Sequence, residues 1–355
     1  MVTLYIASME DYAGKSALCV GLGAKLVSRE LDIGYMKPVA RKTVAMVEGQ
    51  PVCQDARFMK QVFALREPLA ALAPVLLTPQ LMGVVLGSGE GRYAALVKQA
   101  YAEVAAGKDV VLVEGTTGLV EGSLVGLSAP EVTHLLGACV LLVIRYTDDL
   151  STVEVPLAMQ HVWGDALLGV VFNVIPVGKK TFVEEEVRPY LEDKGISVLA
   201  VLPQERTLLS VSVADLAEHL HGQILNNPER GDELVENLMV GAMAVDSAIE
   251  YFRRKDNKAV ITGGDRTDIQ LAALQTSTKC LILTGNLHPS SLILSQAEDM
   301  GVPLILVKPD TLTVVEEIEH IFGRSRFHQE RKIVKFERLL DEYFDYEALY
   351  TKLGL

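Results

Sequence analysis

A glycine, a lysine and a serine stand together at residues 14–16, within the stretch YIASMEDYAGKSALCVG (residues 5–21). A glycine lets the backbone wrap closely around a phosphate, the lysine ammonium reaches the β and γ oxygens, and the serine hydroxyl can take a coordination position on Mg²⁺. The helix that follows would aim its first amides and its dipole at the anion. The stretch therefore predicts a phosphate-binding loop. Its expected contacts are Tyr12, Ala13, Gly14, Lys15, Ser16 and Ala17.

One position of this loop departs from the usual phosphate-loop pattern. The pattern has a glycine five residues before the second glycine, and this chain has Met9 there. The alternative interpretation is an ordinary strand-to-helix turn with a lysine at the start of the helix. The position of the loop, after the first predicted strand and before the first predicted helix, favours phosphate binding.

Three polar residues follow, each near the end of an apolar run or in a nearby loop. Lys37 lies in YMKPVA, Asp55 in QDARFM and Glu114 in VLVEGTTGL. Taken singly, each would be a solvated surface side chain. Together with the hydroxyl of Ser16, the two carboxylates would form the oxygen site that Mg²⁺ prefers. We therefore expect Ser16, Asp55 and Glu114 to hold a metal, and Lys15 and Lys37 to be the catalytic lysines of any phosphoryl transfer.

Asn173 ends another apolar run, VVFNVIP. Its amide has both donors and an acceptor, so it could recognise the edge of a purine base. The predicted ligands are thus ATP or GTP with Mg²⁺, and the sequence does not distinguish the two nucleotides.

These residues need a scaffold, and the first two hundred residues supply an alternating pattern. Amphipathic helical stretches, such as residues 16–31 and 91–107, separate continuous apolar strands. This alternation predicts an α/β fold, a parallel sheet with helices on both faces, which binds ligands beyond the carboxyl ends of its strands. The predicted strands are residues 3–8, 32–39, 109–115, 139–146, 167–175 and 197–203.

The pattern restarts after residue 207, which predicts a P-loop domain at 1–207 and a smaller α/β domain at 208–325. Residues 326–355 are charged and helical in period, as in a docking or linking tail. Two loops of the smaller domain, 262–268 and 283–291, contain glycines after predicted strands. They are either simple helix starts, with Asp265 as one N-cap, or an anion or nucleotide pocket for an unknown small molecule.

Composition narrows the function classes. The chain has 355 residues and a formal charge of −13, which disfavours a general nucleic-acid binder. Its four cysteines are scattered, as in a reducing compartment, and the run at 135–144 is too short to span a bilayer. We expect a cytoplasmic protein that binds neither nucleic acid nor membrane.

In this order, the residues resemble the dethiobiotin synthetase fold, and more closely the dethiobiotin-synthetase-like N-terminal region of bacterial phosphotransacetylases. The matching motifs are Gly14-Lys15-Ser16, Lys37-Pro38, Asp55, Glu114-Gly115 and Asn173. LMVGAM, VITGGDRTDIQLAAL, CLILTGN and GVPLILVKPDT resemble the DRTGG domain that follows in those proteins. The resemblance covers residues 1 to about 345 and does not include the acetyl-transferring domain, so it does not imply acetyl transfer.

The residues and the resemblance together leave three functions open, which we rank. The first is a regulatory protein that binds ATP or GTP with Mg²⁺ and whose DRTGG-like domain senses a ligand or mediates homo-oligomerisation. The second is an ATP-dependent enzyme of the dethiobiotin synthetase class that activates a carboxylate or carbamate. The third is an oligomerising scaffold with a vestigial phosphate loop, an interpretation that Met9 supports.

Overall fold

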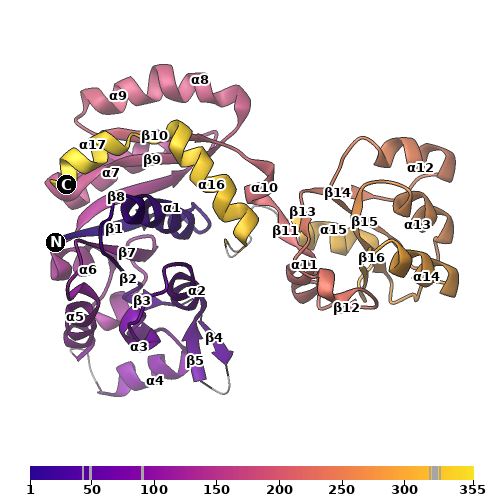
Figure 1. The fold of residues 1–355 in the computed structure, drawn as a ribbon, viewed down its shortest axis with the longest axis horizontal. Helices are drawn as coiled ribbons and strands as arrows, with labels where there is room; N and C mark the ends of the chain where they lie inside the picture. The colour runs from indigo at the N-terminus through magenta and orange to yellow at the C-terminus, as the bar shows by residue number, and fades with distance from the viewer. Residues whose placement is uncertain (42–43, 48–49, 89–91, 320, 322–326, 328) are drawn as a thin grey trace. The chain divides into compact units, whose positions relative to one another are not determined.

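The computed structural model describes residues 1–355 apart from 42–43, 48–49, 89–91, 320, 322–326 and 328 (Figure 1). The contacts between residues divide the chain into two compact units. One is Met1–Gln204 together with Glu330–Leu355, and the other is Glu205–Gln329. The boundary expected at residues 325 and 326 lies outside the described residues. The C-terminal segment, expected as a separate tail, is thus part of the first unit.

The first unit is built on a six-stranded sheet with the order β10-β9-β8-β1-β7-β2. Every neighbouring pair in it is parallel. Its strands are β1 Val2–Ser8, β2 Ile33–Met36, β7 Val110–Thr117, β8 Cys139–Arg145, β9 Leu167–Ile175 and β10 Val198–Pro203. The central strands β1, β7 and β8 are mostly apolar and are buried apart from one or two terminal residues each, as a sheet covered on both sides requires. The predicted α/β fold is therefore confirmed.

Helices cover this sheet (Figure 1), and four short strands form two separate two-stranded sheets, β3-β6 and β4-β5. The helices are α1 Lys15–Ser28, α2 Gln54–Val62, α3 Leu69–Leu72, α4 Pro79–Ser88, α5 Arg92–Ala105, α6 Ala129–Leu136, α7 Ser151–Trp163, α8 Lys180–Phe182 and α9 Arg188–Asp193. The short strands are β3 Val39–Ala40, β4 Val44–Val47, β5 Gln50–Cys53 and β6 Val75–Leu76.

Two C-terminal helices, α16 Glu330–Tyr343 and α17 Tyr346–Leu353, pack against α1 and β10. The spacing of Phe336, Leu339 and Leu340 places their side chains on one buried face of α16. A Cβ at Gly21 of α1 would come within 2.3 Å of Leu340 Cδ1, so the two helices approach closely because residue 21 has no side chain. Apolar burial thus attaches the end of the chain to the first unit.

The second unit has a five-stranded sheet with the order β12-β17-β16-β15-β14, parallel except at β12. Alternate residues of β15 and β16 enter two cores, with Ile261 and Ile282 on one face and Val260 and Leu281 on the other. The strands are β11 Val211–Ser212, β12 Gln223–Ile224, β13 Leu234–Val235, β14 Asn237–Val240, β15 Lys258–Gly263, β16 Thr278–Thr284 and β17 Leu304–Leu306. The helices are α10 Arg206–Leu209, α11 Val213–His219, α12 Val245–Phe252, α13 Thr267–Leu274, α14 Ser291–Asp299 and α15 Thr311–Glu319. The smaller α/β domain is confirmed.

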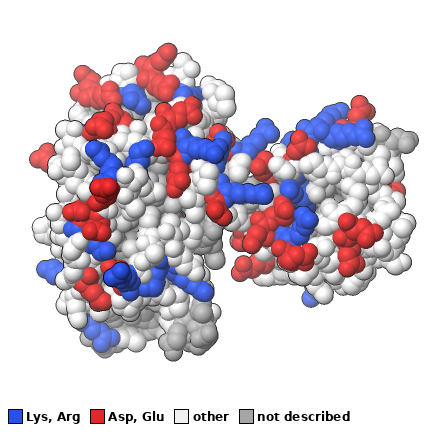
Figure 2. Space-filling view, viewed as in Figure 1, with Lys and Arg blue, Asp and Glu red and all other residues white. Residues whose placement is uncertain are grey.

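Basic and acidic side chains are interspersed over the face shown in Figure 2. Within the described ranges, no helix combines the length and the apolar character needed to cross a bilayer.

Candidate functional site

The predicted phosphate loop connects β1 to α1 at the carboxyl edge of the first sheet. Gly14 is the N-cap residue of α1 and has a φ of 111°, and Tyr12 also has a positive φ, 57°. A Cβ at Gly14 would lie 2.4 Å from Asn173 Nδ2. The loop therefore needs glycine at this position both for its backbone conformation and for the close approach of β9.

Lys15 is held at the base of this loop by hydroxyl groups. Its Nζ donates to Ser8 Oγ at 2.7 Å and to Thr117 Oγ1 at 3.4 Å. Burial lowers the pKa of Lys15, and the nearby charge of Glu114 opposes that shift. Neutral hydroxyls are weaker partners for an ammonium than phosphate oxygens are, so a bound phosphate would compete well for this lysine.

Ser16, Lys37, Asp55 and Glu114 meet beside the loop, although they come from α1, the β2–β3 connection, α2 and β7. Ser16 Oγ donates to Glu114 Oε1 at 2.9 Å, and Lys37 Nζ contacts the same oxygen at 2.8 Å. Lys37 also forms an ion pair with Asp55. The lysine and the two carboxylates are buried, with exposed fractions of 8%, 5% and 1%.

The pKa of Lys37 reflects a competition between burial and charge. Burial alone would lower it, but the carboxylates of Glu114 and Asp55 together raise it well above its ordinary value. Lys37 is therefore a permanent cation between two buried anions. This arrangement satisfies the rule that a buried charge needs a partner.

The chemistry of this cluster fits a hard divalent cation. Ser16, Asp55 and Glu114 bring a hydroxyl and two carboxylates to one place, and Mg²⁺ completes such a partial shell with phosphate and water oxygens. No group of three or more His, Cys, Asp or Glu side chains suited to a metal occurs in the part of the chain that the structure describes. A metal bound here would therefore need the Ser16 hydroxyl and the phosphate oxygens of a nucleotide, in addition to the two carboxylates, as ligands. Metal binding by these three residues stays a prediction.

Sequence reasoning missed Tyr35, which is fully buried on β2. Its hydroxyl donates to Glu114 Oε2 at 2.9 Å. Each oxygen of Glu114 therefore has a donor, because Ser16 and Lys37 contact the other one. A signal was present in the sequence, since Tyr35 precedes Lys37 by two residues, the spacing that places side chains on one face of a strand.

Asn173 lies at the carboxyl end of β9 beneath the loop. Its Nδ2 donates to Ala13 O at 2.8 Å, and its Oδ1 accepts from the backbone N–H of Val174 at 2.9 Å. The first bond ties the amide to the loop, and the second fixes its orientation on β9. Recognition of a purine base by Asn173 stays a prediction and would use the second hydrogen of Nδ2 and the second lone pair of Oδ1.

The two glycine-bearing loops of the second unit lie in close contact. A Cβ added at Gly264 would be only 1.7 Å from Leu287 O, so this approach requires glycine. Gln270 Nε2 donates to the carbonyls of Gly263 and Gly264, at 2.8 and 3.0 Å. The expectation that Asp265 caps α13 is wrong, because the N-cap residue is Arg266, without a side-chain cap bond. The loop stays one residue longer than the local pattern suggested.

A parallel sheet with Gly-Lys-Ser between its first strand and first helix defines the class of P-loop proteins. Residues 2–212 match the family model described as an AAA domain (AAA_26), and residues 215–321 match the DRTGG domain. The chain belongs to this AAA-domain family and carries a DRTGG domain after it. The curated relatives described next confirm the resemblance to the N-terminal region of phosphotransacetylases.

Curated relatives share this arrangement. The chain is 25% identical to a phosphate acetyltransferase of Nitratidesulfovibrio vulgaris over 373 aligned residues, covering 99% of this chain and 51% of that protein. It is 22% identical to the phosphate acetyltransferase of Synechocystis sp., covering 99% and 52%. The chain thus spans about half the length of these relatives.

Among solved structures, cobyrinic acid a,c-diamide synthase from Mycobacterium smegmatis with bound ADP and magnesium is 17% identical. The match covers 58% of this chain and 87% of that one, with a TM-score of 0.36.

Proposed function

We propose that the first unit binds ATP or GTP with Mg²⁺ and that the chain is a regulatory protein related to the N-terminal region of phosphotransacetylases. The supporting observation is the loop itself. Gly14 begins α1 in a conformation that favours glycine, Lys15 points to the base of the loop, and Ser16 contacts Glu114. In this proposal Lys15 moves from its hydroxyl partners to the phosphates, and Ser16, Asp55 and Glu114 hold the metal.

The proposal extends to the setting of the protein. The four cysteines are free, as expected in the reducing cytoplasm.

Self-association is supported by exposed apolar side chains on α4. The exposed fractions are 53% for Met82, 44% for Val84 and 74% for Leu86. The ligand of the DRTGG domain is a small molecule whose class stays undefined.

The test is thermal unfolding of the wild type and Lys15→Met with ATP, GTP or no nucleotide, always with Mg²⁺. At a nucleotide concentration of about 100 times Kd, binding adds about 2.7 kcal/mol to the stability of the wild type. We expect a clear rise in melting temperature that Lys15→Met loses. The matched control is Lys179→Met, an exposed lysine paired with Asp148, which should keep the rise.

If neither nucleotide raises the melting temperature of the wild type, the regulatory proposal fails. The scaffold with a vestigial loop then becomes the better description, and Met9 would mark the loss of phosphate binding.

A second candidate function is ATP-dependent activation of a carboxylate or carbamate. The buried, permanently charged Lys37 beside Ser16 favours it, because such a cation can neutralise charge that develops on a transferred phosphoryl group. Substrate-dependent release of ADP would separate this enzyme from a protein that only binds nucleotide.

A further inference from the structure

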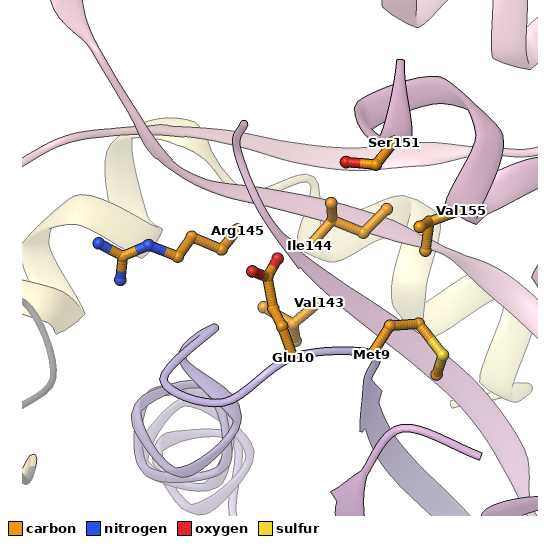
Figure 3. A pocket seen from close by; sticks show the side chains of 7 residues that line it. All are labelled: Met9, Glu10, Val143, Ile144, Arg145, Ser151 and Val155. Carbon is orange, nitrogen blue, oxygen red and sulfur yellow. The ribbon is translucent and has the colours of Figure 1, made fainter. Parts of the chain in front are cut away.

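A pocket of about 170 Å³ lies beside the phosphate loop (Figure 3). It is lined by Met9, Glu10, Val143, Ile144, Arg145, Ser151 and Val155. At about 30 Å³ for one water-sized group, it has room for roughly six such groups. Neither the nucleotide contacts nor the metal ligands proposed above occupy it.

The topology of the sheet explains why a crevice forms here. β1 and β8 are parallel neighbours. Helix α1 leads from β1 towards β2 at one edge of the sheet, whereas α7 leads from β8 towards β9 on the other side. The two connections therefore diverge at the carboxyl ends of β1 and β8. Open α/β sheets bind ligands at such a switch point.

The pocket gives a role to Met9, the residue that replaces the first glycine of the usual phosphate-loop pattern. Figure 3 shows its side chain forming one wall, opposite Val155 of α7. A glycine at this position would leave that wall open. Met9 is therefore part of a formed pocket, and its presence does not require that the loop has lost its function.

The chemistry of the lining is that of an apolar slot with an anionic end. Four of the seven lining residues are apolar: Met9, Val143, Ile144 and Val155. The Glu10 carboxylate stands among them, while the guanidinium of Arg145 extends away (Figure 3) and donates to Tyr12 O at 3.4 Å.

Charged groups near Glu10 determine how favourable a cation is at this part of the pocket. Burial raises the pKa of Glu10 most, and the charge and the backbone N–H of Arg145 lower it. Asp149 raises this pKa, and the charge of Lys15 lowers it. Asp149 also accepts from the Ser151 hydroxyl at 2.5 Å, so it stands behind the pocket wall. A half-buried carboxylate next to a second acidic group gains from a cation beside it.

We propose that this pocket binds a small organic cation, an alkylammonium group on a short apolar body, with Glu10 as its counter-ion and Met9 as one wall. The ammonium would lie at the Glu10 carboxylate, and the alkyl chain would replace water along Val143, Ile144 and Val155. This binding is independent of nucleotide and goes beyond the proposed function.

The experiment is a titration of the full chain, without nucleotide, followed by NMR of methionine methyl groups labelled with ¹³C. The probe is n-butylammonium, compared with n-butanol and with butyrate. The Met9 signal is assigned with Met9→Leu, and Met300 of the second unit is the internal reference. We expect a saturable shift of Met9 with a Kd on the order of 1 mM, a reasonable affinity for about five non-hydrogen atoms.

Two variants make the test specific. Glu10→Gln keeps the shape of the side chain and removes its charge, so it should weaken butylammonium binding about tenfold or more, which corresponds to about 1.4 kcal/mol or more. Lys25→Met removes a cation from an exposed pair with Asp341 that does not line the pocket, so it should bind the probe as the wild type does.

Three outcomes would overturn the proposal. The first is no saturable change at Met9 up to about 50 mM probe, a concentration at which even very weak sites fill. The second is an equal shift for butanol, and the third is an unchanged affinity in Glu10→Gln, because either would show that the charge of Glu10 does not take part.

Discussion

Replacing Lys37 by methionine is expected to lower the free energy of unfolding by about 3–5 kcal/mol, the usual cost of removing one partner from a buried ion pair. Methionine fills much of the same volume, so packing is largely preserved. The carboxylates of Asp55 and Glu114 lose the ammonium that contacts both of them. Tyr35 and Ser16 still donate to Glu114, but hydroxyl groups do not neutralise a buried charge. Urea unfolding followed by circular dichroism measures the loss.

The matched control is Lys25→Met. Lys25 Nζ lies 2.7 Å from Asp341 Oδ1, as close as a strong ion pair, but the two side chains are 37% and 57% exposed. Exposed pairs contribute about 0–1 kcal/mol because water screens them. Adding Glu114→Gln to Lys37→Met should recover part of the stability, since one uncompensated charge is removed. Equal losses for Lys37→Met and Lys25→Met would show that burial does not govern the cluster.

The long-range contacts of the site could not be predicted from local sequence. Ser8 and Thr117, the partners of Lys15, are opposite each other because β1 and β7 pair in a particular register. A one-residue slip would exchange the faces of a strand, and nothing in the local pattern of either strand specifies the pairing. The glycine, lysine and serine of the loop were recognisable because these three consecutive residue types indicate phosphate binding without any long-range contact.

The strands themselves were predictable for a different reason. Parallel strands buried on both faces are continuous apolar runs, and the run at residues 139–146 corresponds to β8 Cys139–Arg145. Predictions for single polar residues were weaker. Asp265 matches the residue type of a helix cap, but the helix begins one residue later, with Arg266 as its N-cap. Asn173 was predicted to be a site residue from its position at a strand end. The sequence did not indicate that its amide donates to Ala13 O, because that contact depends on how the loop folds over β9.

Gly14→Ala is the second change for which a large effect is expected. A φ of 111° lies outside the left-handed region that L-residues can occupy, so alanine costs at least about 1–2 kcal/mol in backbone strain. Its Cβ would also displace Asn173 Nδ2, and with it the hydrogen bond to Ala13 O, at a further cost of about 1 kcal/mol. We expect stability to fall by about 2–3 kcal/mol and nucleotide-dependent stabilisation to disappear.

Gly107→Ala separates the two causes. Gly107 also has a positive φ, 72°, but an added Cβ there meets no atom within 4 Å among the described residues. It should cost only about 1 kcal/mol of backbone strain and leave the nucleotide-dependent rise in melting temperature unchanged. If Gly14→Ala destabilised the protein no more than Gly107→Ala and still responded to nucleotide, the contact between the loop and β9 would be dispensable. That result would mean that Lys15 and the α1 amides of Gly14→Ala still bind phosphate without the contact to Asn173.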